Sequence, residues 1–176
     1  MTAPLPSREL VILRHAKSDW DSGAEHDFDR PLNGRGKRDA PRMGRWMKER
    51  GLIPDLVISS PAKRAKGTVK AVVKALGKSK DDIHWEERVY EASLQTLLGL
   101  VSGLPTEFRR VLLVGHNPGL EELVSYLISP SQLPEPPVGF LKTGALARLT
   151  LDTPWAELER GGADLTQLML PKQVEG

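Results

Sequence analysis

Short, uniformly apolar runs alternate along this chain with longer segments of helical periodicity. The runs at 10–13, 56–58 and 111–114 contain only leucine, valine and isoleucine, a composition typical of strands buried on both faces of a parallel sheet. The first strand is predicted over 8–14. Apolar stripes at spacings of three and four residues follow each run and predict helices. This alternation favours an α/β fold, a three-layer α/β/α arrangement with a mostly parallel central sheet.

Capping residues predict where the helices begin. A helix start is expected wherever such a residue precedes an apolar stripe: at Asn33, Ser60-Pro61, Ser93 and Asn117-Pro118. Pro41 falls inside the first of these helices and predicts a kink or a late start. Further strands are predicted at 83–85, 145–151, 155–159 and 165–170. The proline-rich stretch 129–139 is expected to be a stiff surface loop, and residues 1–7 a frayed tail of a single domain spanning 1–176.

Composition narrows the classes of protein that this chain can be. With 176 residues, 39% hydrophobic and 27% charged, it has the composition of one globular domain. A net charge of +2 is too small to indicate a nucleic-acid partner. The chain has no cysteine, so it forms no disulfide, and it has neither a signal-like start nor a membrane-length apolar run. We therefore expect a cytoplasmic protein with no membrane contact. The basic run at 35–50 is expected to be a solvated helix face, with docking of an acidic protein partner as the alternative.

Three of the predicted strands end in residues suited to bind an anion. Arg14 and His15 follow the first strand, Arg64 lies in the first turn after the second, and His116 follows the third. Carboxyl ends of parallel strands meet at one edge of a sheet, where helix N-termini add a positive dipole end. Since no set of carboxylate ligands accompanies these four side chains, the pattern predicts a phosphate site and neither a metal nor a cofactor.

The same residues suit phosphoryl transfer. The planar fork of an arginine matches the equatorial oxygens of a phosphoryl group in transfer. A neutral imidazole can attack phosphorus and carry the group as phosphohistidine, which water then hydrolyses. One of the two histidines must therefore be neutral, while the other can be protonated and donate to a phosphoryl oxygen.

Three motifs, in this order, resemble the histidine phosphatase superfamily: Leu-Arg-His-Ala-Lys-Ser at 13–18, Ser-Ser-Pro-Ala-Lys-Arg-Ala-Lys-Gly-Thr at 59–68 and Val-Gly-His-Asn-Pro-Gly at 114–119. The first motif, Asp-Arg-Pro-Leu-Asn at 29–33 and the short chain resemble more narrowly the SixA-type phosphohistidine phosphatases. The resemblance implies a phosphoglycerate mutase-like fold. It also implies His15 as the phosphorylated nucleophile, with Arg14, Arg64 and His116 completing the phosphate pocket.

The chain departs from the broad family pattern at two positions. Ala16 stands where many members have glycine, and Asp21 stands where many have an asparagine that contacts phosphate. Because a carboxylate would repel phosphate, that role is not carried over to Asp21. Glu91 lies at about the place of the family's general acid, and Asp19 and Asp21 are alternatives. A phosphohistidine substrate would need the acid less, because its imidazole can leave already protonated.

The sequence therefore predicts a metal-independent phosphatase that acts through phosphorylation of His15. The expected substrate is phosphohistidine in a protein, and inorganic phosphate is the expected product. One alternative is a phosphomonoesterase of small phosphorylated metabolites, which would depend strongly on Glu91. A second alternative is a catalytically weak phosphate-binding or interaction protein that keeps the pocket.

Overall fold

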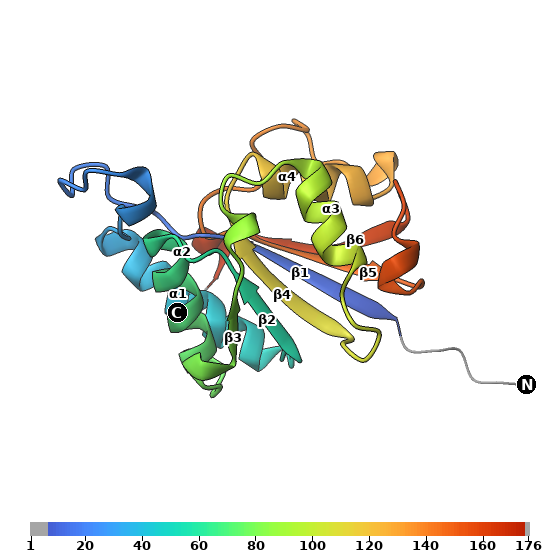
Figure 1. Cartoon of the computed structure of the whole chain (residues 1–176), viewed down its shortest axis with the longest axis horizontal. Coiled ribbons are helices and arrows are strands. Elements are labelled where there is room, and N and C mark those ends of the chain that lie inside the picture. The colour runs from blue at the N-terminus through green and yellow to red at the C-terminus, as the bar shows by residue number, and fades with distance from the viewer. Residues whose placement is uncertain (1–6, 175–176) are drawn as a thin grey trace, which may run out of the picture.

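A six-stranded sheet lies between two pairs of helices in the computed structural model, which describes residues 7–174 (Figure 1). Most of the predicted tail, residues 1–6, lies outside the described residues. The strands stand in the order β3-β2-β4-β1-β5-β6 across the sheet. Their bounds are β1 Arg8–Arg14, β2 Leu56–Ser59, β3 Ile83–Trp85, β4 Arg110–Gly115, β5 Leu146–Leu151 and β6 Ala163–Met169.

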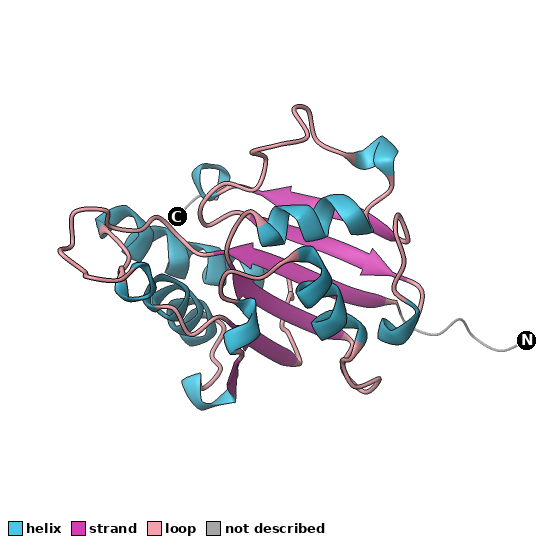
Figure 2. Ribbon diagram, turned by 45° about the horizontal axis from the view of Figure 1, so that its top comes forward, coloured by secondary structure: helices cyan, strands magenta, loops and turns pink. Residues whose placement is uncertain are grey.

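The sheet is mostly parallel, as predicted. Strands β1, β2, β3 and β4 pair in parallel, whereas β5 pairs antiparallel with both β1 and β6. Only β5 among the described strands runs against the others (Figure 2). In the register of the parallel strands, Arg14 lies beside Gly115, and Ser59 beside Val114. The carboxyl ends of β1, β2 and β4 therefore reach the same edge.

The helices cover both faces of the sheet and so confirm the three-layer arrangement (Figure 1). Their bounds are α1 Gly34–Glu49, α2 Lys63–Ala75, α3 Leu94–Ser102 and α4 Gly119–Leu127. Val11 and Leu13 of β1 pack in the core beneath α1 and α2. Leu10 and Ile12, which point the opposite way, pack in the core beneath α3 and α4. The uniformly apolar run at 10–13 is thus explained by burial on both faces of the strand.

The first predicted helix begins where its capping residue indicated. The Asn33 side chain accepts a hydrogen bond from the Gly36 N–H at 2.9 Å. The late start predicted from Pro41 is wrong, because α1 begins at Gly34 and continues through the proline. Close packing on α2 stabilises this helix: a Cβ added at Gly44 would lie 2.9 Å from the Val72 carbonyl oxygen.

Two helix starts were predicted slightly too early. Helix α2 begins at Lys63 and not at Pro61, because the Ser60 hydroxyl bonds the ring of His116 at 2.8 Å and the Ala62 N–H at 3.2 Å. Helix α4 begins at Gly119, one residue after the predicted start. At Ser93 the prediction is confirmed, since its hydroxyl accepts from the Thr96 N–H at the start of α3.

The strand predicted at 155–159 is wrong, because Trp155–Glu157 form a short 3-10 turn. The Trp155 side chain is fully buried, and its indole N–H donates to the Phe108 carbonyl oxygen at 2.9 Å. This tertiary anchor replaces strand pairing. The strands predicted at 83–85, 145–151 and 165–170 correspond to β3, β5 and β6. None of the helices described in residues 7–174 is both long and apolar enough to cross a bilayer.

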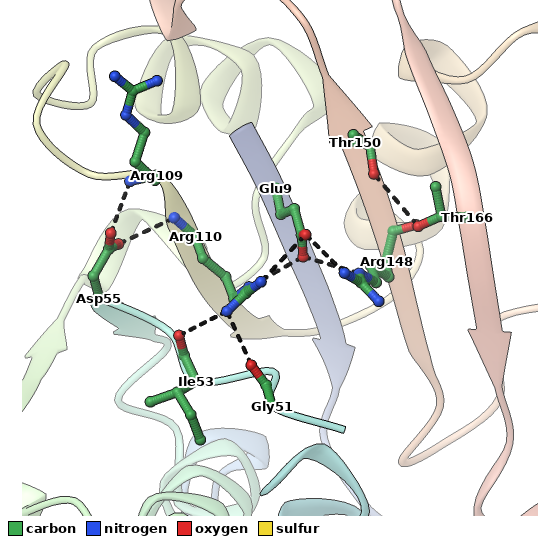
Figure 3. Close-up of polar contacts among 9 residues, drawn as sticks. All are labelled: Glu9, Gly51, Ile53, Asp55, Arg109, Arg110, Arg148, Thr150 and Thr166. Atoms are coloured by element: carbon green, nitrogen blue, oxygen red, sulfur yellow. Dashed lines mark hydrogen bonds and ion pairs between the residues drawn. The ribbon is translucent and has the colours of Figure 1, made fainter. Parts of the chain in front are cut away.

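Ion pairs tie the strands together near the amino end of β1 (Figure 3). The Glu9 carboxylate accepts hydrogen bonds from Arg110 on β4 and from Arg148 on β5, with distances between 2.7 and 3.3 Å. Burial alone would raise the pKa of Glu9, but the hydrogen bonds from Arg148 and Arg110 outweigh burial and lower it. This cluster of ion pairs lies near the amino end of β1, at the opposite end of the strand from Arg14.

Candidate active site

The carboxyl edge of the sheet brings the four predicted phosphate-binding side chains together. Arg14 ends β1 and His15 follows it, His116 follows β4, and Arg64 lies in the first turn of α2. The His15 and His116 ring centroids are 5.2 Å apart, and Arg64 Nε lies 3.4 Å from His15 Nε2. Arg14 is close enough to both imidazoles for its charge to disfavour their protonation. These side chains come from three segments separated by about fifty residues each.

Hydrogen bonds fix the orientation of the His15 imidazole. His15 Nδ1 lies 2.7 Å from the Ala16 carbonyl oxygen. Because a carbonyl oxygen can only accept, the ring proton is on Nδ1, and the lone pair is on Nε2, where it accepts from Arg64 Nε at 3.4 Å. The backbone is held as well: His15 N–H donates to Gly115 O at 3.0 Å, and Ala16 N–H donates to the Thr68 hydroxyl at 2.9 Å. The nitrogen with the lone pair is therefore the one that faces Arg64.

Only one ring nitrogen of His116 has a hydrogen-bond partner among the described residues. Its Nε2 lies 2.8 Å from the Ser60 hydroxyl, and the Tyr90 ring packs edge-on against it with centroids 5.3 Å apart. Its Nδ1 is buried and has no hydrogen-bond partner among the described residues. A buried ring nitrogen of this kind is suited to bind a ligand that enters between the two imidazoles. Ser60 was interpreted from sequence as a helix cap, so its contact with His116 was missed.

An unpredicted carboxylate, Asp27, orients Arg64. The Arg64 guanidinium donates to the Asp27 backbone oxygen at 2.7 Å and to its carboxylate at 2.8 Å. The same carboxylate accepts from Tyr90 at 2.8 Å and from Arg30 at 3.1 Å. Burial would raise the pKa of Asp27, but the hydrogen bonds from Tyr90, Arg64 and Arg30 lower it to about 2. Asp27 is therefore ionised at neutral pH and is no proton donor there.

Both histidines are neutral in the free protein. Burial lowers the pKa of His15 to about 3 against the opposing hydrogen bond to Ala16, and the charges of Arg64 and Arg14, with that of His116 whenever it is protonated, add to burial. Burial, followed by the charge of Arg64, lowers the pKa of His116 to about 4. The prediction that one histidine can be protonated is thus not met without a ligand. A neutral His116 can still donate one ring proton.

A cavity of about 360 Å³ opens beside the histidines, and Glu91 lines it together with Asp27, Tyr90 and His116. Glu91 is exposed and has a φ of 54°, the only positive φ of a non-glycine residue among those described. This backbone conformation costs about 1–2 kcal/mol and holds the residue at the rim of the cavity.

The alternative general acids, Asp19 and Asp21, lie away from this cavity, on the loop that precedes α1. Asp19 accepts from the backbone N–H of Asp21 at 2.8 Å, so its carboxylate is engaged within its own loop. Neither residue lines the cavity. Of the three general-acid candidates, only Glu91 faces it. Within residues 7–174 no three His, Cys, Asp or Glu side chains are grouped closely enough to hold a metal ion.

Comparison with known proteins agrees with the fold and the motifs. A family model described as the histidine phosphatase superfamily (branch 1) matches residues 10–117. The crystal structure of the Agrobacterium tumefaciens protein assigned as phosphohistidine phosphatase SixA has a TM-score of 0.79 and 32% identity, covering 93% of this chain and 98% of that one.

Two curated relatives match shorter parts of the chain. An uncharacterised chloroplastic protein of Arabidopsis thaliana is 32% identical over 133 residues, which cover 71% of this chain and 61% of the plant protein. The match thus spans about three fifths of that relative's length. A 2,3-bisphosphoglycerate-dependent phosphoglycerate mutase of Streptomyces avermitilis is 33% identical over 95 residues, covering 52% of this chain and 37% of the mutase.

Proposed function

This chain belongs to the histidine phosphatase superfamily and is of the SixA type, and on that basis we propose that it removes phosphate from phosphohistidine in a protein through a covalent intermediate on His15. The observation that carries the proposal is the state of His15: neutral, with Nδ1 donating to Ala16 and the Nε2 lone pair beside Arg64. Such an imidazole is ready to act as a nucleophile at neutral pH.

In the first step, His15 Nε2 attacks phosphorus. A P–Nε2 bond forms as the bond from phosphorus to the substrate's imidazole nitrogen breaks. The leaving imidazole, already protonated on its other nitrogen, takes the electron pair and departs as the neutral ring. Arg14 and Arg64 bind the equatorial oxygens, and the ring N–H of His116 donates to another oxygen. These groups develop their strongest contacts as charge spreads over the oxygens.

In the second step, water attacks the phosphorus of phosphorylated His15. The P–Nε2 bond breaks, its electron pair returns to the imidazole, and the water's proton is released with inorganic phosphate. The two arginines supply the positive charge that a metal ion supplies in other phosphoryl-transfer sites. We therefore propose a reaction that needs no metal.

A second candidate function, hydrolysis of small phosphomonoesters, is favoured by the position of Glu91. The exposed carboxyl group at the rim of the cavity can protonate a leaving alkoxide, which an imidazole leaving group does not require. The similarity to a phosphoglycerate mutase over part of the chain supports the same alternative.

Kinetics on two substrates separates the candidates. A phosphohistidine peptide and an alkyl phosphate are compared for the wild type and Glu91→Gln. We expect the peptide to be the better substrate and its kcat/KM to change less than about threefold in the variant, because no alkoxide needs a proton. If the wild type prefers the alkyl phosphate, and its kcat/KM on that substrate falls by about a hundredfold in Glu91→Gln, the result would instead support the phosphomonoesterase.

His15→Ala tests the intermediate itself. It should abolish both turnover and acid-labile incorporation of labelled phosphate into the protein, because it removes the imidazole nitrogen that faces Arg64. Retention of either property would refute the assignment of the nucleophile. Phosphate binding by the wild type without any turnover would favour a binding protein that keeps the pocket.

A further inference from the structure

A second pocket, of about 400 Å³, is lined by Arg14 of the proposed phosphate site and shares no lining residue with the cavity beside His116. Five of its eight lining residues carry positive charge and none is acidic. Its lining consists of Arg14, Lys17, Arg35, Lys142, Thr143, Leu170, Pro171 and Lys172. These eight residues define the basic pocket.

Segments distant in sequence build the basic pocket around the end of β1. The Gly144 N–H donates to the carbonyl oxygens of both Arg14, at 3.2 Å, and His15, at 2.8 Å, which places Lys142 beside the strand end. Pro171 packs against the same point: a Cβ added at Gly144 would lie 2.8 Å from Pro171 Cγ. This contact positions the turn that carries Lys172. The basic pocket is therefore built onto the strand end that carries His15.

Little within the described part of the chain neutralises the basic pocket. Arg35 pairs with Asp39 at 3.5 Å, whereas Lys17, Lys142 and Lys172 form no ion pair in residues 7–174. Arg14 donates one N–H to the Leu141 carbonyl oxygen at 3.0 Å, and its buried Nε has no partner among the described residues. Unpaired cations gathered beside a polar atom of this kind favour binding of an anionic group.

We propose that the basic pocket binds a second anionic group of the same molecule that presents its phosphoryl group to His15. This inference rests on the proposed function and narrows its substrate class. Arg14 lines the basic pocket and its charge also acts on both imidazoles, so a group bound there lies next to the phosphoryl group. Two sources carry this chemistry: acidic side chains that flank a phosphohistidine, and a second phosphate in a small molecule.

The test uses the double variant Lys142→Gln/Lys172→Gln. Both lysines are exposed, so their replacement leaves the core intact. Lys80→Gln is the matched control, because Lys80 is an exposed lysine in the turn before β3, away from the carboxyl edge. The substrates are a phosphohistidine peptide flanked by glutamates, the same peptide flanked by glutamines, propyl phosphate, and propane-1,3-diol bisphosphate.

We expect the double variant to lose about two- to fivefold in kcat/KM per lysine on the glutamate-flanked peptide. The loss should shrink at high salt, and the glutamine-flanked peptide should be unaffected. A loss confined to the bisphosphate would assign the second anion to a small molecule. Equal losses on charged and neutral partners, or no loss on either charged substrate, would overturn the proposal.

If the chain is not a phosphohistidine phosphatase, the experiment gives a result that differs from the one expected when only the basic pocket fails to bind an anion. If the wild type turns over neither peptide, the phosphohistidine activity is refuted, and equilibrium binding of the unphosphorylated peptides decides the inference by itself. Tighter binding of the glutamate-flanked peptide that is lost in the double variant but not in Lys80→Gln would support the basic pocket. Equal or undetectable binding of the two peptides would refute it.

Discussion

Acidification should destabilise this protein through the two buried histidines of the candidate site well before its ionised carboxylates are protonated. His15 and His116 are only 6% and 8% exposed, and burial lowers their pKa values to about 3 and about 4. In the unfolded chain both pKa values return to about 6.5. Between these limits the unfolded state binds protons that the folded state does not, so stability is complete above about pH 6.5 and falls as the pH falls towards the folded values.

The magnitude near pH 5 depends little on how far the folded values are lowered. Each pH unit below about 6.5 costs about 1.4 kcal/mol per histidine while the folded imidazole stays neutral. A change to pH 5 covers about 1.5 units and therefore costs about 2 kcal/mol per histidine, or about 4 kcal/mol for the pair. That is a large share of the 5–15 kcal/mol that holds an ordinary domain folded. Glu9 and Asp27, whose pKa values are lowered, keep their charge at this pH.

Urea unfolding at pH 8 and pH 5 measures the effect. For the wild type the free energy of unfolding should fall by about 4 kcal/mol, for His116→Gln by about 2 kcal/mol, and for His15→Gln/His116→Gln by almost nothing. Comparing each variant with itself at two pH values cancels any fixed cost of the substitution. His26→Gln, which removes an exposed histidine outside the site, is the control. Equal pH differences in the wild type and the double variant would refute the reasoning.

Three further predictions concern single contacts. Arg64→Lys should lower kcat/KM by about tenfold or more with the fold intact by circular dichroism, because a point charge cannot replace a guanidinium fork; an unchanged rate would place Arg64 outside the reaction. Asp27→Asn should lower kcat but tighten inhibition by phosphate, since it loosens Arg64 while removing a negative charge, and the exposed Asp21→Asn should do neither. Glu9→Gln should lower the free energy of unfolding by about 1–3 kcal/mol in urea titrations at neutral pH and leave kcat unchanged; a loss of kcat with unchanged stability would contradict the structural role.

Part of the candidate site could be predicted because parallel strands obey one simple rule about residues far apart in the sequence. The three apolar runs indicate buried strands. If these strands are parallel, their carboxyl ends lie at the same edge of the sheet, so the residues that follow the runs meet there. Arg14, His15 and His116 could be placed without any knowledge of packing, because each follows its strand directly. Arg64 required one further assumption, that a helix begins soon after β2.

The errors arose where a distant contact overrides a local rule. Ser60 followed by a proline matches a helix cap, but its hydroxyl binds the ring of His116, a residue 56 positions away. The pattern at 155–159 matches a short strand, but Trp155 is held by the carbonyl oxygen of Phe108. Local patterns cannot distinguish these cases, because the competing partner is not in the same window of sequence.

Asp27 escaped prediction for an electrostatic reason. A carboxylate beside phosphate is repulsive in isolation, and five acidic residues between 19 and 29 look alike in the sequence. In the structure Asp27 is surrounded by Arg64, Arg30 and the Tyr90 hydroxyl, which stabilise its charge. Its negative charge lies within the anion site because cations outnumber it there.

The charge balance of the site explains why such a carboxylate suits a phosphatase. The sequence indicated as many as four cations, but burial keeps both imidazoles neutral. Asp27 and the three arginines, Arg14, Arg64 and Arg30, together carry two formal positive charges. These four groups by themselves match the charge of a phosphate dianion. Without Asp27 the surplus charge would bind the product more tightly and slow its release, and the predicted fall in kcat with tighter phosphate inhibition in Asp27→Asn tests this balance directly.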